Sequence, residues 1–363
     1  MKKLYVLLLL SIGIFLFSCG NGEIPSATGQ LVELQAKYVT SRPQLDGLAN
    51  DPVWEDTMPF IVHFDADETN GKEFNLTLRA IWWNDWAMSG SSGWGEKAYF
   101  AILATWPDDD KSIDKYVWKY NPADSTWTRS REQSDWLLFR WPSISAYNDV
   151  WYWDAALTNP LGYAEDAYVE TVTLPDSTVK QRLWIDGLNF YNDTATERNT
   201  YDLNYDDNFT PRDSSDDKPK YAWKEDITTT PPSLPRIFSA DEDRYHFLLR
   251  NEADFLKYTP YAEPTEAVTV PGYVLEDPVD HSADILAAGT WSNGQWTVEI
   301  VRAASTDESN DIVLNPNDRW FNQVIYVWVG NNEKSPIETG IEDTKFITKS
   351  IVLNFEYVAF ERP

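Results

Sequence analysis

Apolar and polar residues alternate with a period of two along most of this chain of 363 residues. The pattern is clear in NLTLRAIWW (75–83), AYFAILATW (98–106), QWTVEIVRA (295–303) and ITKSIVLNFEYV (347–358). Successive side chains of a strand point to opposite faces of its sheet, so this period predicts strands. We therefore expect an all-β fold, an antiparallel β-sandwich of the immunoglobulin-like or jelly-roll type with long loops.

Turns and interruptions divide the chain. Asn293-Gly294 between two alternating runs predicts a two-residue hairpin. Residues 186–280 depart from the alternation and are rich in Asp, Asn, Thr and Pro, so we interpret them as one large acidic insertion in a single domain spanning 38–363. Within it, residues 240–256 are the best candidate for a helix, and that helix would be short.

The N-terminus has the pattern of a targeting segment. Lys2 and Lys3 precede an apolar stretch that ends in LFSC, which resembles a bacterial lipobox. We expect residues 1–18 to be a lipoprotein signal peptide and residues 19–37 to be a lipidated Cys19 with a flexible tether. No Asp follows Cys19, which by resemblance to sorting rules favours the outer membrane of the cell envelope. An ordinary signal peptide and a transmembrane anchor are the alternatives.

Composition excludes several functions. Cys19 is the only cysteine, so disulfides, zinc–thiolate sites, iron–sulfur clusters and a catalytic cysteine are excluded. The formal net charge of −28 makes nucleic acid an implausible partner. The sequence contains no G-x-S-x-G, H-E-x-x-H, P-loop or G-x-G-x-x-G motif, so we expect a non-catalytic module.

Four motifs in order resemble one family. They are LDGLANDPVW (45–54), YFAILATWPDDDKS (99–112), DWLLFRWP with DVWYWDAALTNPLGYAEDAYV (135–142 and 149–169), and GTWSNGQWTVEIVRA with DIVLNPNDRWFNQVIYVW (289–303 and 311–328). They are similar to the haem-binding domains related to ethylbenzene dehydrogenase, and to the fold-related family nine-type carbohydrate-binding modules. The resemblance implies a sandwich that holds b-type haem between a methionine and a lysine.

The candidate haem ligands are incomplete. The family's methionine would fall in SISAYN (143–148), which contains none. We assign the possible cofactor-binding residues as Lys349, Met88, Met58, Trp151 and Trp153. The competing interpretations are core packing for Met58, Trp151 and Trp153, and a strand-edge lysine reaching solvent for Lys349. Three histidines could also ligate iron, but no spacing pairs His63, His246 and His281.

Two acidic segments suggest a cation. DLNYDDNFTPRD (202–213) imitates a calcium loop through Asp202, Asn204, Asp206 and Asp213, although Asp207 stands where such a loop needs glycine. Glu165 and Asp166 follow a turn, where they bind a cation or cap the loop. A solvated acidic loop is the alternative interpretation for residues 202–213.

Our leading hypothesis is an extracytoplasmic lipoprotein with a b-haem-binding sandwich and an accessory electron-transfer role. Its partners would be the membrane, through the N-terminal lipid, and redox proteins. The first alternative is a surface lipoprotein that stacks glycan rings on tryptophan. The second is a structural or assembly component that has lost haem.

Overall fold

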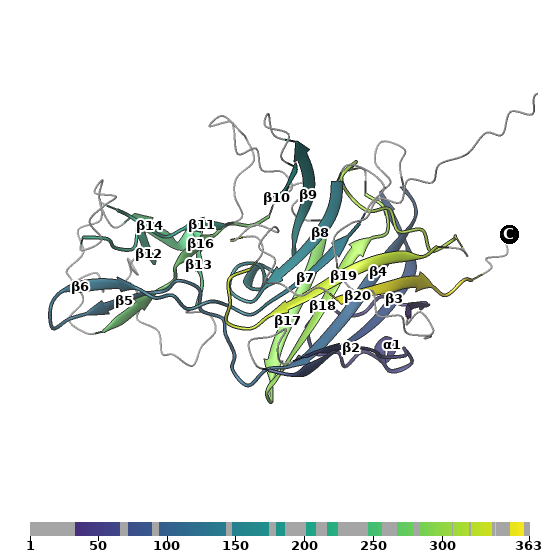
Figure 1. The fold of residues 1–363 in the computed structure, drawn as a ribbon, viewed down its shortest axis with the longest axis horizontal. Helices are drawn as coiled ribbons and strands as arrows, with labels where there is room; N and C mark the ends of the chain where they lie inside the picture. Colours follow the sequence, from purple (N-terminus) through teal and green to yellow (C-terminus); the bar gives the residue numbers. More distant parts are fainter. Residues whose placement is uncertain are drawn as a thin grey trace, which may run out of the picture. The chain divides into compact units, whose positions relative to one another are not determined.

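The computed structural model describes residues 33–65, 72–88, 94–142, 147–173, 179–185, 201–207, 216–223, 246–255, 267–278, 284–306, 308–318, 321–335, 338 and 349–358. Nearly all of the regular structure in these residues is β, as the alternation predicted. The main feature is a large sheet that is nearly closed into a barrel-like sandwich (Figure 1).

This large sheet has twelve strands in the described residues, in the order β10-β9-β8-β7-β19-β20-β1-β3-β4-β18-β17, with β2 paired to β3. Its strands are β1 (Glu33–Tyr38), β2 (Phe60–Phe64), β3 (Phe74–Met88), β4 (Trp94–Pro107), β7 (Trp136–Trp141), β8 (Tyr147–Asp154), β9 (Glu165–Thr173), β10 (Val179–Ile185), β17 (Ile285–Ser292), β18 (Gln295–Ala303), β19 (Gln323–Gly330) and β20 (Lys349–Phe355). A single-turn helix, α1 (Pro52–Glu55), precedes β2.

Most pairings are antiparallel, as expected, but β1 is parallel to both of its neighbours. It inserts between β20 and β3, with Leu34 opposite Leu353 and Ala36 opposite Ala80. The expected tether over residues 19–37 therefore extends too far. ELQAKY alternates Leu34 and Ala36 inward, and both are fully buried. The folded domain consequently begins at least as early as Glu33.

Two local sequence predictions have opposite outcomes. Asn293 and Gly294 both have positive φ, 54° and 76°, and they join β17 to β18 in the predicted hairpin. The helix expected over 240–256 is wrong for the described residues 246–255. There the chain forms β13 (Leu248–Leu249), a 3₁₀ turn (Arg250–Glu252) and β14 (Ala253–Phe255), which pairs with β12 (Tyr221–Trp223).

The described part of the 186–280 segment forms short strands. They are β11 (Tyr201–Leu203), β12, β13, β14, β15 (Val268–Val270) and β16 (Tyr273–Leu275), and β15 pairs with the hairpin of β5 (Trp118–Asn121) and β6 (Thr126–Arg129). Trp223, Leu248 and Val274 pack with Trp118 of that hairpin. The small apolar cluster of this segment thus depends on residues that precede it by more than seventy positions.

The core of the sandwich is unusually rich in indole rings. Trp82, Trp106, Trp141, Trp151, Trp153 and Trp296 are all at most 1 % exposed and belong to one apolar cluster with the inward rows of the strands. Glycine makes room for two other close indole contacts. A Cβ on Gly289 would lie 2.3 Å from the Trp153 ring, and one on Gly330 would lie 2.0 Å from the Trp136 ring.

We expect Trp153→Ala to lower the free energy of unfolding by about 3–5 kcal/mol, because it removes a fully buried ring that contacts Trp106 and Trp296. The matched control is Met58→Ala. Met58 is 81 % exposed, so its loss should stay within about 0.5 kcal/mol. Urea unfolding of both variants measures the difference. Equal losses would contradict the assignment of Trp153 to the core.

Candidate functional site

The two tryptophans considered as a ligand platform are core residues. Trp151 and Trp153 project from β8 to the interior, and both are 0 % exposed. The Trp151 ring lies 4.6 Å from that of Trp141, and the Trp153 ring lies 5.1 Å from that of Trp296. The core interpretation is therefore correct for both, and neither presents a face to a ligand in this structure.

The methionine and lysine candidates do not form a haem-ligand pair. Met58 lies before β2 and is exposed, so the interpretation that it packs in the core is wrong. Lys349 is the first residue of β20, and its side chain lies beside the other end of β2. Its Nζ is 5.9 Å from the Phe64 ring and 4.0 Å from Asp65. The run from Phe60 to Phe64 alone spans about 13 Å, so Met58 and Lys349 cannot ligate one iron. Met88 ends β3, and its side chain lies outside the described residues.

The histidines are dispersed. His63 is exposed and bonds Asn75, with its Nδ1 2.9 Å from the amide oxygen. His246 contacts Asp114 at 2.7 Å and lines a cavity of about 180 Å³ with Trp291 and Trp296. That volume is below the roughly 300–1,000 Å³ of typical cofactor sites, so this cavity does not accommodate a porphyrin. His281 lies outside the described residues.

The calcium-loop candidates have other roles. Asp202 lies in β11 and pairs with Arg250. The Asn204 side chain is buried and binds backbone, since its amide nitrogen donates to the carbonyls of Tyr221 and Pro271 and its oxygen accepts from the Tyr221 amide. Asp206 forms a backbone bridge with Lys218, and Asp213 lies outside the described residues. The described members therefore do not form an EF-hand-like site.

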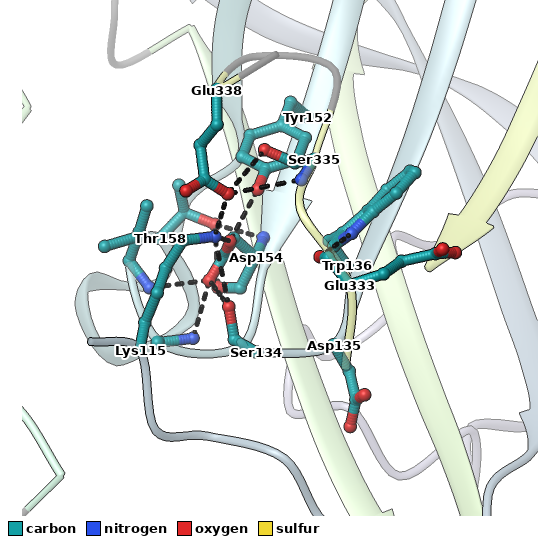
Figure 2. A network of polar contacts seen from close by, with 12 residues as sticks. Lys115, Ser134, Asp135, Trp136, Tyr152, Asp154, Thr158, Glu333, Ser335 and Glu338 are labelled. Carbon is teal, nitrogen blue, oxygen red and sulfur yellow. Dashed lines mark hydrogen bonds and ion pairs between the residues drawn. The ribbon is translucent and has the colours of Figure 1, made fainter. Parts of the chain in front are cut away.

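A buried polar network links three separate segments (Figure 2). The Lys115 ammonium donates to Asp154 at 2.9 Å and contacts Glu338 at 3.0 Å, and all three side chains are buried or nearly so. Asp154 also accepts from the hydroxyls of Ser134 and Tyr152, at 2.7 and 2.5 Å. The network therefore holds the loop before β5, the end of β8 and the loop after β19 together.

The directions of the pKa shifts favour a structural role for this network. Burial would lower the pKa of Lys115, but Asp154 and Glu338 reverse that effect and raise it above its ordinary value. Burial likewise opposes ionisation of Asp154, yet Lys115 and the hydroxyl donors lower its pKa. Both groups stay charged around neutral pH, whereas an efficient general acid or base needs a pKa near the working pH.

A second carboxylate holds the WPDDDKS turn (106–112) in place. Burial, with nearby Asp108, raises the pKa of Asp135 to about 7. Its oxygens accept from the Trp296 indole at 2.8 Å, the Ser112 amide at 2.9 Å and the Asn332 amide at 3.3 Å. These donors occupy the carboxylate, so Asp135 connects the turn to the core rather than facing a substrate.

Described residues line a cleft of about 670 Å³ on the outer face of the large sheet. One wall is the loop of residues 42–51, and the other is built from β3, β4, β17 and β18. The lining residues are Arg42, Pro43, Gln44, Leu45, Asp51, Trp83, Asp85, Tyr99, Leu286 and Val301. We call this site the outer cleft. None of these residues was singled out as a ligand contact in the sequence.

Aromatic rings form the floor of the outer cleft. Trp83 and Tyr99 stack with ring centroids 5.6 Å apart and an interplanar angle of 15°, and Tyr99 is the more exposed of the two. Burial and nearby Asp85 raise the pKa of the Tyr99 phenol. The rim is polar, because Arg42, Gln44, Asp51 and Asp85 surround this floor.

The loop wall is fixed by one buried carboxylate. Glu299 of β18 accepts from the amides of Asp46 and Gly47, at 3.0 and 2.8 Å, and from the Trp54 indole at 2.8 Å. Gly47 has φ +71° and lies so close to Thr290 that a Cβ would come within 2.9 Å of its backbone nitrogen. The positive φ and the close contact with Thr290 both require glycine at position 47, which explains the Asp-Gly pair in LDGLANDPVW.

We expect Lys115→Met to cost about 3–5 kcal/mol of unfolding free energy, since it leaves Asp154 buried without its cation. The matched control is Lys119→Met, because Lys119 pairs with Glu132 at 2.7 Å where both side chains are about half exposed. That loss should stay within about 1 kcal/mol. Chemical denaturation of the two variants tests the contrast, and similar losses would refute it.

The comparisons with known proteins support the resemblance over the part of the chain that carries its later motifs. A search of curated proteins finds no match. The model of the ethylbenzene dehydrogenase family matches residues 145–337, more than half of the chain, including β8, β9 and the strands from β17 to β19. Ethylbenzene dehydrogenase is a haem-containing enzyme, so the match relates this sandwich to redox and haem chemistry. The chain belongs to the ethylbenzene dehydrogenase family.

Proposed function

We propose that this protein is an extracytoplasmic lipoprotein that binds b-type haem in the outer cleft and has an accessory electron-transfer role. The observation that carries the proposal is the cleft itself, which combines an aromatic floor, apolar walls and a polar rim that includes one arginine. Its volume of about 670 Å³ is within the usual range for cofactor sites. The partners would be redox proteins outside the cytoplasm.

The side chains of the outer cleft offer haem iron an axial ligand that differs from the methionine–lysine pair of the family. Haem iron accepts the phenol oxygen of tyrosine as an axial ligand, and Tyr99 supplies that group. Arg42 on the rim is suited to a haem propionate, because guanidinium pairs with carboxylates through two parallel hydrogen bonds. Leu45, Leu286 and Val301 offer apolar contact to the macrocycle. Bound haem would supply one-electron chemistry.

A glycan is the second candidate ligand, and one observation favours it. The Tyr99 ring is supported from behind by Trp83, and the amide of Gln44 and the carboxylates of Asp51 and Asp85 lie around it. A flat ring with polar groups at its edge suits a sugar as well as a porphyrin. If neither ligand binds, the third hypothesis, a structural or assembly component, is left.

Attachment to the membrane rests on the N-terminal sequence. Cys19 and the preceding apolar stretch lie outside the described residues. In the part of the chain that is described, no helix has the length and apolar character needed to cross a membrane. We propose that a diacylated Cys19 attaches the protein to the outer membrane.

The haem proposal is tested on a soluble form, residues 20–363, titrated with ferric haem and followed by absorption spectroscopy. We expect saturable binding with a shifted Soret band. Tyr99→Phe should weaken binding by at least about 100-fold, because losing a group that only orients a metal ligand already costs about 10- to 100-fold. Lys349→Met and Met58→Leu are the controls and should leave the spectrum unchanged.

The same titration has a defined pH dependence. Ligation by phenolate releases the Tyr99 proton, whose pKa is raised, so the apparent affinity should increase about tenfold per pH unit below that pKa. Tyr99→Phe should lose this slope. A spectrum abolished by Lys349→Met instead would restore the ligation implied by the family. Glycan binding without haem binding would favour the second candidate.

Lipidation is tested by expressing the full chain with Cys19→Ser. We expect the unmodified protein to incorporate a labelled fatty acid and to sediment with membranes. The variant should lose both properties, since no other thiol exists in the sequence. A variant that still sediments with membranes after a carbonate wash would indicate a transmembrane anchor.

A further inference from the structure

Three acids from distant segments meet at one end of the sandwich interior. Asp166 lies at the start of β9, Asp284 immediately precedes β17, and Asp311 follows β18. One carboxylate oxygen of each lies within 4.8 Å of the others. The backbone brings them together, because Tyr163 bridges to Leu286 and the Ala164 amide donates to the Ile285 carbonyl at 3.0 Å. We call Asp166, Asp284 and Asp311 the acid cluster.

A fourth carboxylate and one guanidinium adjoin the acid cluster. Arg302 donates to Asp149 at 2.5 Å and pairs with Asp311 at 3.0 Å, while its guanidinium lies 5.2 Å from the Trp151 ring. Asp149, Asp166 and Arg302 are at most 1 % exposed. The Arg302 guanidinium therefore pairs with Asp149 and Asp311 and lies near Asp166, and buried like charges are costly unless cations compensate them.

Asp149 supplies an independent observation. Its Oδ2 binds Arg302 and the Ile312 amide, but its Oδ1 is buried and has no hydrogen-bond partner among the described residues. In the strand register Trp151 is opposite Asp166 and Asp149 is opposite Tyr168, so Asp149 and Asp166 share the inner face. A buried carboxylate oxygen without a donor costs free energy, and a metal ion would remove that cost.

We propose that the acid cluster binds a calcium ion, with Asp149 completing its negative surroundings. An all-oxygen donor set selects a hard cation. Calcium accepts irregular carboxylate geometry, whereas magnesium demands a near-ideal octahedron, and these ligands come from three unrelated segments. Asp284 is only partly buried, which gives the ion a route from solvent. The ion would join the β9 side of the sandwich to β17 and β18.

A proton is the competing explanation for the charge balance. Burial, opposed by Arg302 and reinforced by Asp311, raises the pKa of Asp149 to about 6. A protonated Asp149 would reduce the need for a metal only near and below that pH. The two explanations therefore predict different results at pH 8. Asp149 is ionised there, so any stabilisation by added calcium must come from binding of the ion.

The test uses the soluble form, residues 20–363, stripped with EDTA and dialysed to pH 8. Calcium chloride is titrated against the thermal unfolding midpoint, and terbium luminescence excited through tryptophan is read in parallel. We expect a saturable rise in the midpoint and sensitised terbium emission that calcium displaces. No calcium-dependent rise at pH 8, or stabilisation by magnesium but not calcium, overturns the proposal.

Variants locate the ion. Asp284→Asn should weaken calcium binding at least tenfold, and Asp311→Asn should do the same if that variant folds. Asp56→Asn is the matched control, since it removes one exposed acid and should leave binding unchanged. Asp202→Asn examines the calcium-loop candidate. Loss of binding in Asp202→Asn but not in Asp284→Asn would place the ion in residues 202–213 and overturn the assignment.

Discussion

The hydrogen bonds of Glu299 are the constraint on which the outer cleft depends. A carboxylate buried in β18 binds two backbone amides of the loop at Asp46 and Gly47 and the indole of Trp54. Burial raises the pKa of Glu299, while these three donors oppose that rise by stabilising the ionised form. These polar contacts add to the apolar packing of Trp54 and Ala49 against residues of β3 and β4. Two motifs separated by more than two hundred positions, LDGLANDPVW and GTWSNGQWTVEIVRA, are therefore halves of one structural contact.

The indole-filled interior determines where a ligand can bind. Six tryptophans with at most 1 % exposure fill the space between the described strands, and their close packing opposes entry of a second large ring system there. A haem of this family would have to displace several of those rings or bind elsewhere. The outer cleft provides the second option without disturbing the core. Trp151 and Trp153 belong to this packed interior and present no ring to a surface.

Sequence reasoning was sufficient for the features that depend on local periodicity. The inward rows of β3, β4 and β20 and the Asn293-Gly294 turn follow from alternation and turn chemistry alone. Strand order does not, because nothing local in ELQAKY indicates a parallel position between β20 and β3. The helix expected over 240–256 failed where it can be examined, since pairing of β14 with β12 overrides the helical preference of that segment.

The candidate sites also depend on long-range contacts that local sequence patterns do not reveal. Arg42 and Tyr99 line one cleft although fifty-seven positions separate them, and the acids at 166, 284 and 311 meet only through the closing contacts of the sheet. Asp166 was recognised as a possible cation ligand from its turn, but its partners could not be. Lys115 and Glu299 gave no signal beyond a charged residue near an apolar run. Their roles come from burial, which a sequence does not display.

The two proposed sites lie back to back on the β17–β18 hairpin. Leu286 and Val301 are register partners and line the outer cleft, whereas their neighbours Ile285 and Arg302 are also partners and face the interior. An ion at the acid cluster would restrain the inner pair, Ile285 and Arg302. The adjacent outer pair, Leu286 and Val301, forms a wall of the cleft. Ligands that both favour one arrangement of a shared element are thermodynamically coupled, and the coupling is reciprocal. Calcium and the cleft ligand should therefore each strengthen binding of the other, through the hairpin rather than through contact.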